Sequence, residues 1–314
     1  MKTYILISLF LIFSFTSYSQ QDAQYTQYMY NMGVVNPAYA TSTEDIMNIG
    51  LIHRSQWVGA FGAPRTGSLF IHTPIKENME IGLSFINDQI GEDIVNENFI
   101  SGDFAYILNL NESLKLSFGI KAGVNFFNTD FSGLTLPDGT IVGSNSFDPN
   151  VNNINRAFLN IGAGTFLFSE KYYIGLSVPN FLNNKHLKNR NGISSVGEEE
   201  LHFFLTSGYV FDISNSVKFK PAVMLKAVNS APLSFDLSAN FLIQEKFTVG
   251  ISHRFDDSLS ALAGFQITPD LKIGYAYDYT TTNLGDYNSG THELFVLFNL
   301  NLANNGIEKS PRFF

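Results

Sequence analysis

The sequence contains no cysteine, a single tryptophan and few charged residues, which make up 15% of the chain. Without cysteine there can be no disulfide, no thiolate metal site and no lipid anchor on a cysteine. The net charge of −9 excludes nucleic acid as a partner, because phosphate binding requires a basic surface. After the first 20 residues there is no run of about 18 apolar residues, so no membrane-spanning helix is expected.

Aromatic residues and glycine are abundant instead. The 314 residues include 30 Phe, 14 Tyr and 25 Gly, in a chain long enough for one large domain or two small ones. Aromatic and glycine enrichment together with low charge is typical of many β-strands that place one face against an apolar environment.

The N-terminus is typical of a secretory signal. Lys2 is followed by an apolar run from Tyr4 to Phe15 and then by the small residues Ser17 and Ser19. A membrane anchor is the alternative, but the run is too short to span a bilayer. We therefore expect a signal peptide over residues 1–19, cleaved before Gln20, and an exported protein.

From residue 46 onward the apolar residues alternate with polar ones. In "PLSFDLSANFLI" (232–243) and "LKIGYAYDY" (271–279) every second residue is large and apolar, and this period of two predicts strands. The predicted strands have roughly the ten-residue length of a tilted bilayer-crossing strand. About fourteen are expected, near 46–56, 65–73, 79–87, 98–108, 114–125, 156–168, 171–178, 201–212, 216–228, 232–243, 246–255, 258–267, 270–279 and 292–301.

The connections between these strands differ in length. Short turns such as "NES" (111–113) and "QEK" (244–246) alternate with longer polar connections. The longer connections are expected near 88–97, 126–155, 179–200 and 280–291. This asymmetry predicts an all-β fold, a transmembrane antiparallel β-barrel over residues 46–302 with periplasmic turns and extracellular loops, followed by a periplasmic tail over 303–314. A soluble all-β protein is the alternative, and its strands are usually shorter.

The polar face of these strands should line the lumen, where Asp236, Asp278 and Glu293 can pair with lysines. Arginines also face inward near the long-loop rim, where "GLIHR" and "GISHR" end in Arg54 and Arg254, and Arg156 begins a strand. They either form an outer site for an acidic segment or neutralise Asp and Glu in the loops, which is the more common arrangement. Trp57 is expected at the outer membrane interface.

Catalytic signals are weak. His53 and Ser55 lie on one strand face two residues apart, which allows a lipid-facing hydrolase, but the sequence indicates no third group to orient the pair. We expect no enzymatic activity and predict no cofactor or metal site.

The segment "QDAQYTQYMYNMGVVNPAYA" (21–40) fits neither strand nor linker. Tyr25, Tyr28, Met29 and Met32 would share one face of a short helix that Asp22 caps and that ends before Pro37. Residues 20–45 are therefore either a plug in the barrel or a periplasmic arm held by another protein. The residues expected to make these contacts are Gln24, Tyr25, Tyr28, Asn31, Asn36 and Pro37.

Several motifs resemble the PorP/SprF family of Bacteroidetes outer-membrane proteins. They begin with "QYTQYMYNMGVVNPAYA" and "HRSQW" and continue through "SVPN", "LHFFLTSGY", "YDY", "GTHE" and the terminal "SPRFF" in a consistent order. The resemblance implies a non-enzymatic barrel accessory to type IX secretion. Such barrels are linked to the export or surface attachment of large adhesins, including those of gliding motility, that carry a C-terminal secretion domain. The implied partners are that adhesin domain, machinery subunits on the periplasmic side and outer-membrane lipid. A solute transporter or porin-like barrel is the alternative.

Overall fold

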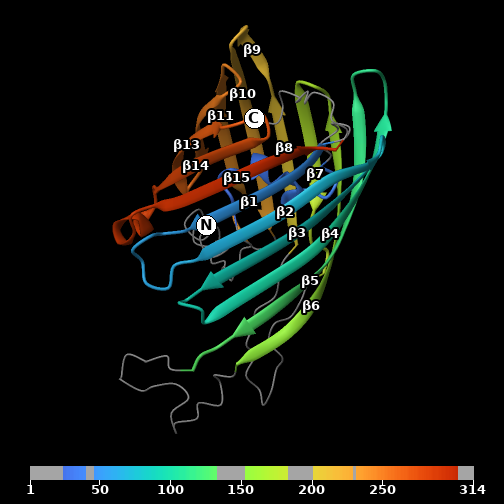
Figure 1. Ribbon diagram of the computed structural model, residues 1–314. Coiled ribbons are helices and arrows are strands. Elements are labelled where there is room, and N and C mark those ends of the chain that lie inside the picture. The colour runs from blue at the N-terminus through green and yellow to red at the C-terminus, as the bar shows by residue number, and fades with distance from the viewer. Residues whose placement is uncertain (1–23, 40–45, 133–152, 183–200, 229–230, 303–314) are drawn as a thin grey trace, which may run out of the picture.

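The computed structural model describes residues 24–39, 46–132, 153–182, 201–228 and 231–302, and these form one antiparallel barrel around a short N-terminal segment (Figure 1). The first eight strands are β1 (Ile46–Ser55), β2 (Arg65–Lys76), β3 (Met79–Ile90), β4 (Val95–Asn109), β5 (Lys115–Thr129), β6 (Ile154–Phe168), β7 (Tyr172–Val178) and β8 (His202–Tyr209). The others are β9 (Phe211–Ser214), β10 (Val217–Val228), β11 (Ser234–Ile243), β12 (Phe247–Arg254), β13 (Ser258–Gln266), β14 (Leu271–Thr280) and β15 (Thr291–Asn301).

Apart from β8 and β9, each strand pairs with the next one in sequence, and the pairing of β1 with β15 closes the sheet. The predicted strand 201–212 is interrupted at Val210, which separates β8 from β9. Because β8 and β9 both pair with β10, they occupy one position in the wall. The barrel therefore has the fourteen strand positions that the alternation predicts. Closure pairs the backbone groups of every strand, which is required in lipid.

The two rims differ as predicted, with one correction. Tight turns join β4 to β5, β6 to β7 and β11 to β12 at one rim, where β1 also begins and β15 ends. The prediction of a long loop over 88–97 is wrong, because β3 and β4 continue to a turn at 91–94. The amides of Asn87, Asn96 and Asn98 bond to one another across this hairpin, so polar side chains that indicated a loop support a strand pair instead. We refer to this second rim as the outer rim and to the tight-turn rim as the periplasmic rim.

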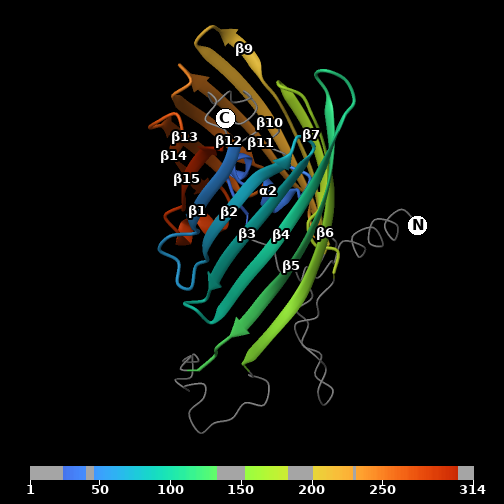
Figure 2. The ribbon, with the colours of Figure 1, turned by 45° about the vertical axis from the view of Figure 1, so that its right-hand side comes forward.

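The strands β5 and β6 have 15 residues each and extend past their neighbours at the outer rim (Figure 2). β5 continues beyond the predicted end at 125 to Thr129. β6 begins at Ile154, before the predicted start at 156. The connection between them covers residues 130–153, of which 133–152 lie outside the described part of the chain. Arg156 is placed near the tip of this extension.

The two faces of the wall differ in chemistry. Leu83, Ile120 and Ile251 are 58–62% exposed on the outward face, whereas their neighbours Ser84 and Lys121 are buried on the inward face. An apolar exterior and a polar interior are typical of a barrel in a bilayer. The described helices are all too short to cross a membrane.

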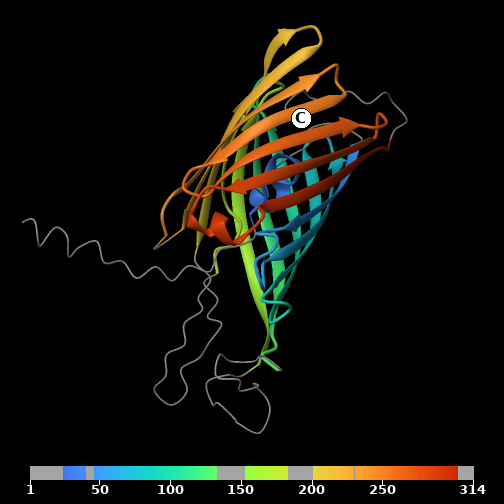
Figure 3. The same ribbon diagram turned by 90° about the vertical axis from the view of Figure 1, so that its left-hand side faces the viewer.

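The N-terminal segment lies inside the barrel at about half its height (Figure 3). It contains the 3₁₀ turn η1 (Tyr28–Tyr30) and the single-turn helix α2 (Met32–Val35). The expected continuous helix is therefore wrong, because Asn31 has a non-helical φ of −132° between the two turns. The helix ends before Pro37 as expected, with Asn36 in extended conformation. The signal peptide, Asp22 and the tail 303–314 lie outside the described residues.

Candidate functional site

Residues 24–39, which we call the lumen segment, are almost completely buried by the barrel wall. Tyr25, Tyr28, Asn31 and Asn36 are each no more than 3% exposed. Burial raises the pKa of the Tyr25 and Tyr28 hydroxyls well above the usual value, so both stay neutral. Of the two placements that the sequence leaves open, these contacts agree with a segment inside the barrel.

The carboxylate of Glu293 on β15 binds the start of the lumen segment. Its two oxygens accept hydrogen bonds from the backbone N–H groups of Gln27 at 2.8 Å and Thr26 at 3.0 Å. Arg54 on β1 forms ion pairs with Glu293 at 3.0 Å and with Asp278 on β14 at 2.9 Å. The Thr26 hydroxyl donates to Asp278 at 2.7 Å. Two buried carboxylates thus face one arginine, and donors of the lumen segment compensate the excess negative charge.

Two lysines bind the middle of the lumen segment. Lys272 donates to the Tyr30 hydroxyl at 3.0 Å and lies 4.6 Å from the centre of that ring, which stacks on Phe295. On the other side of the lumen, Lys121 donates to the carbonyl of Gly33 at 3.1 Å and forms an ion pair with Asp103 at 3.3 Å. Lys121 therefore satisfies a carbonyl of α2 that has no partner within so short a helix.

The tripeptide Asn36-Pro37-Ala38 contacts wall positions that have no side chain. A Cβ added at Gly119 on β5 would lie 2.3 Å from backbone atoms of Pro37 and Ala38. A Cβ at Gly164 on β6 would lie 2.2 Å from Oδ1 of Asn36, whose Nδ2 donates to the Thr165 carbonyl at 3.0 Å. Gly119 thus lets the backbone of the segment approach the wall closely, and Gly164 leaves room for the Asn36 side chain.

Arg156 differs from the other two arginines predicted near the outer rim, which both lie near Asp278. Arg54 and Arg254 are buried, and Arg254 forms a bidentate ion pair with Asp236 at 2.8 Å and a third contact with Asp257 at 3.3 Å. The carboxylates that pair with Arg54 and Arg254 lie mainly on strands of the wall, whereas the sequence predicted carboxylates in the loops. Arg156 lies on the same face of the sheet but is exposed on the extended part of β6.

Trp57 begins the loop between β1 and β2 at the outer rim. It is partly buried, and its backbone N–H donates to the Thr291 hydroxyl at 3.1 Å. This position agrees with a residue at the outer membrane interface.

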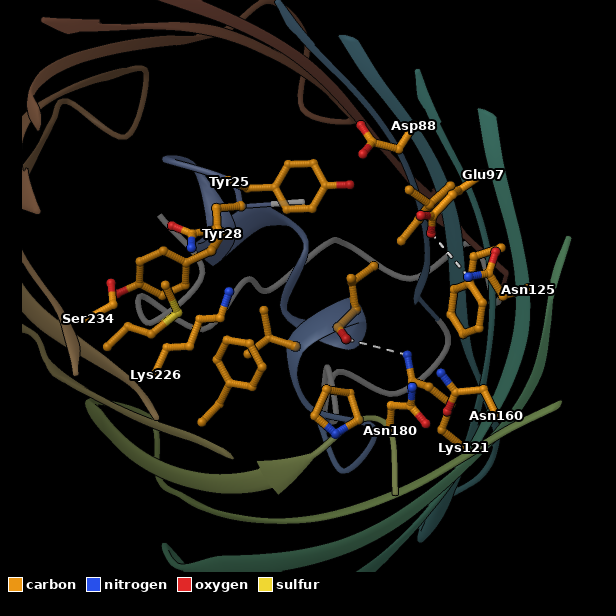
Figure 4. A pocket seen from close by; sticks show the side chains of 18 of the residues that line it. Tyr25, Tyr28, Asp88, Glu97, Lys121, Asn125, Asn160, Asn180, Lys226 and Ser234 are labelled. Atoms are coloured by element: carbon orange, nitrogen blue, oxygen red, sulfur yellow. Dashed lines mark hydrogen bonds between the residues drawn. The ribbon is translucent and has the colours of Figure 1, made fainter. Parts of the chain in front are cut away.

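A cavity of about 160 Å³ lies on the outer side of the lumen segment (Figure 4). The segment contributes Gln24, Tyr25, Tyr28, Val34 and Val35 to its surface. The wall contributes Asp88 and Glu97 near the β3–β4 turn, Asn125 and Asn160 on β5 and β6, and Lys226 on β10. Because each of these wall residues lies in the outer half of its strand, the cavity belongs to the outer side of the barrel.

His53 and Ser55 are close but exposed on the outward face, with 3.3 Å between Nε2 and the hydroxyl oxygen. Within the described residues, this hydroxyl is the hydrogen-bond partner of the imidazole. A nucleophile also needs a base that a third group orients, so the geometry favours no hydrolase.

Sequence reasoning missed Thr26, Lys121 and the glycines at 119 and 164. Alternation puts Lys121 on the lumen face but carries no information on which lumen residues contact a segment 88 positions away. A glycine on the lumen face of an otherwise apolar-polar strand is the one signal that indicates a close backbone approach.

The alternating faces, the closed sheet and the polar lumen define an outer-membrane β-barrel protein. The chain belongs to the PorP/SprF family, since the family model described as type IX secretion system membrane protein PorP/SprF matches residues 17–298. No curated protein matches the chain.

Solved structures similar to this chain include other membrane proteins. A Pseudomonas aeruginosa FadL homologue has 12% identity and a TM-score of 0.44, with 86% of this chain and 94% of that chain covered. The Acinetobacter baumannii outer membrane protein Omp33 has 10% identity and a TM-score of 0.44, covering 82% and 100%. The P. putida toluene transporter TodX has 11% identity and a TM-score of 0.43, covering 86% and 92%. At these identities the similarity concerns the fold alone.

Proposed function

We propose that this barrel binds the C-terminal secretion domain of a large surface adhesin and supports the export or surface attachment of that adhesin. Membership of a type IX secretion family supports a role in secretion. The observation that carries the proposal is the lumen segment, which Glu293, Lys272 and Lys121 bind from different parts of the wall. A lumen occupied by buried, charge-paired contacts suits a protein-binding accessory better than an open pore.

Each rim has a different role in this proposal. The adhesin domain binds at the outer rim, where the longer connections and the cavity lie, through extended surfaces and strand edges. Machinery subunits bind at the periplasmic rim, where both ends of the barrel wall emerge. Neither contact requires covalent chemistry.

Deletion of the gene tests the proposal. A gene for a large adhesin should lie beside it. That adhesin should disappear from the cell surface in the deletion strain, as measured with antibody on whole cells, and return when the full-length gene is supplied. Adhesin levels inside and outside the cell distinguish failed export from failed attachment. Normal surface adhesin in the deletion strain would refute the proposal.

A solute transporter is the second candidate, because the outer cavity has many apolar lining residues, including Phe99, Phe204 and Met224. This function requires a lumen that opens. It predicts measurable ion conductance or solute uptake with the unmodified protein in planar bilayers or liposomes, and a silent barrel would count against it.

A further inference from the structure

The outer cavity combines an apolar interior with polar side chains. Tyr25, Tyr28 and Val34 of the lumen segment line it together with Phe204 and Met224 of the wall. At about 160 Å³ the space is close to that of a cavity of roughly 150 Å³ that holds one benzene molecule. A single aromatic or branched aliphatic group therefore fits it.

The charges around the cavity balance. Its described lining residues include two carboxylates, Asp88 and Glu97, and two ammonium groups, Lys121 and Lys226. Glu97 accepts a hydrogen bond from Asn125 at 3.1 Å, and Lys121 is held by Gly33 and Asp103. A lining without excess charge favours a neutral ligand group, because a buried unpaired charge is costly.

Asn160 on β6 is a lining residue of the cavity that needs a hydrogen-bond partner. Its side-chain oxygen is buried and has no hydrogen-bond partner in the described part of the chain. A buried amide oxygen without a partner is destabilising, and the same holds for the N–H₂ group if the amide is rotated. The ligand should therefore offer a hydrogen-bonding group next to its apolar part. A peptide unit offers both an N–H donor and a carbonyl acceptor.

We propose that the cavity binds one neutral apolar side chain of an extended polypeptide that enters from the outer rim, with Asn160 bonding the adjacent peptide group. This inference rests on the proposed function, since it names the anchor by which an adhesin domain is held. Buried apolar anchors in pockets carry most of the affinity in many protein interfaces. Because Tyr25, Tyr28 and Val34 line the same space, the bound side chain would touch the lumen segment directly.

Two variants that fill the cavity from opposite sides test the inference. Met224→Trp fills it from β10, and Val34→Phe fills it from the lumen segment without changing the wall. Both should weaken binding of the adhesin C-terminal domain to the purified barrel at least tenfold, measured by surface plasmon resonance in detergent. Ile251→Trp on the lipid-facing surface, where Ile251 is 62% exposed, is the matched control and should bind normally. Heat-modifiable migration of each variant on gels verifies that the barrel is folded.

The outcomes separate the two proposals. If the unmodified barrel does not bind the domain, the proposed function fails. If it binds and both filled variants bind equally well, the cavity inference fails and the proposed function stands.

A second measurement needs no adhesin. Saturation-transfer NMR with N-acetylphenylalaninamide should show binding to the unmodified barrel and at least fivefold weaker binding to Asn160→Leu. Toluene, which has no peptide group, should bind both forms alike. Binding of toluene without binding of the amide would overturn the inference and favour a site for small apolar solutes.

Discussion

At the scale of single residues, Glu293 determines how firmly the lumen segment is bound. Replacing it by glutamine removes the ion pair with Arg54 and leaves an N–H₂ group facing donors of Thr26 or Gln27. Hydrogen bonds to a charged group contribute about 1.5–3 kcal/mol each, so the segment should leave its site about ten to a hundred times more often. Because the chain has no cysteine, a Met29→Cys label reports this directly: maleimide should react correspondingly faster in Glu293→Gln.

The control for this change is Glu245→Gln at the periplasmic rim. The Glu245 side chain is 79% exposed and pairs with Lys218 at 3.4 Å. Exposed pairs contribute about 0–1 kcal/mol, so the labelling rate of the cysteine should not change. Equal labelling rates in Glu293→Gln and the unmodified barrel would show that the carboxylate does not hold the segment.

At the scale of elements, the close approach of the lumen segment to β5 gives a steric prediction. In Gly119→Leu the new side chain would overlap the backbone of Pro37 and Ala38, and neither neighbour can move without displacing the segment. The barrel should still fold, because a lumen-facing side chain leaves the strand pairing intact. Periplasmic-side protease should then cleave residues 24–39, which it should leave intact in the unmodified protein.

A matched variant is available on β13. A Cβ at Gly264 also faces the lumen but lies 3.4 Å from its nearest neighbour, the side chain of Lys272, which is ordinary contact. Gly264→Ala should therefore leave the segment protected. Cleavage in both variants would mean that protection does not depend on contact with the wall at Gly119.

The strands also show which parts of the fold can be predicted from sequence patterns. Alternation over 232–243 and 271–279 was sufficient to predict β11 and β14, since a period of two depends only on which face meets lipid. The prediction of a long loop over 88–97 was wrong because polar side chains at a rim are compatible with strands as well as with loops. The contacts of Thr26 were unpredictable for another reason: Asp278 and Glu293 lie 252 and 267 positions away, and their closeness exists only once the barrel closes.

At the scale of the whole molecule, occupation of the lumen separates a protein-binding barrel from a conducting one. The segment contacts β1, β2, β5, β6, β7, β14 and β15, so it is bound around much of the wall. Its removal would expose Arg54, Asp278 and Glu293 to water inside a wall of fourteen strand positions. Barrels of this size without a filled interior contain water.

Deleting residues 24–39 should therefore convert a silent barrel into a conducting one. The unmodified protein in planar bilayers should show little or no single-channel conductance, and the deletion variant should show stable openings of ion-channel size. Gly264→Ala, processed and reconstituted identically, should behave as the unmodified protein. Equal conductance of the unmodified and deleted forms would mean that the segment does not close the lumen. In that case a solute transporter would be as well supported as a protein-binding accessory, because charged contacts that leave a water path intact are compatible with either function.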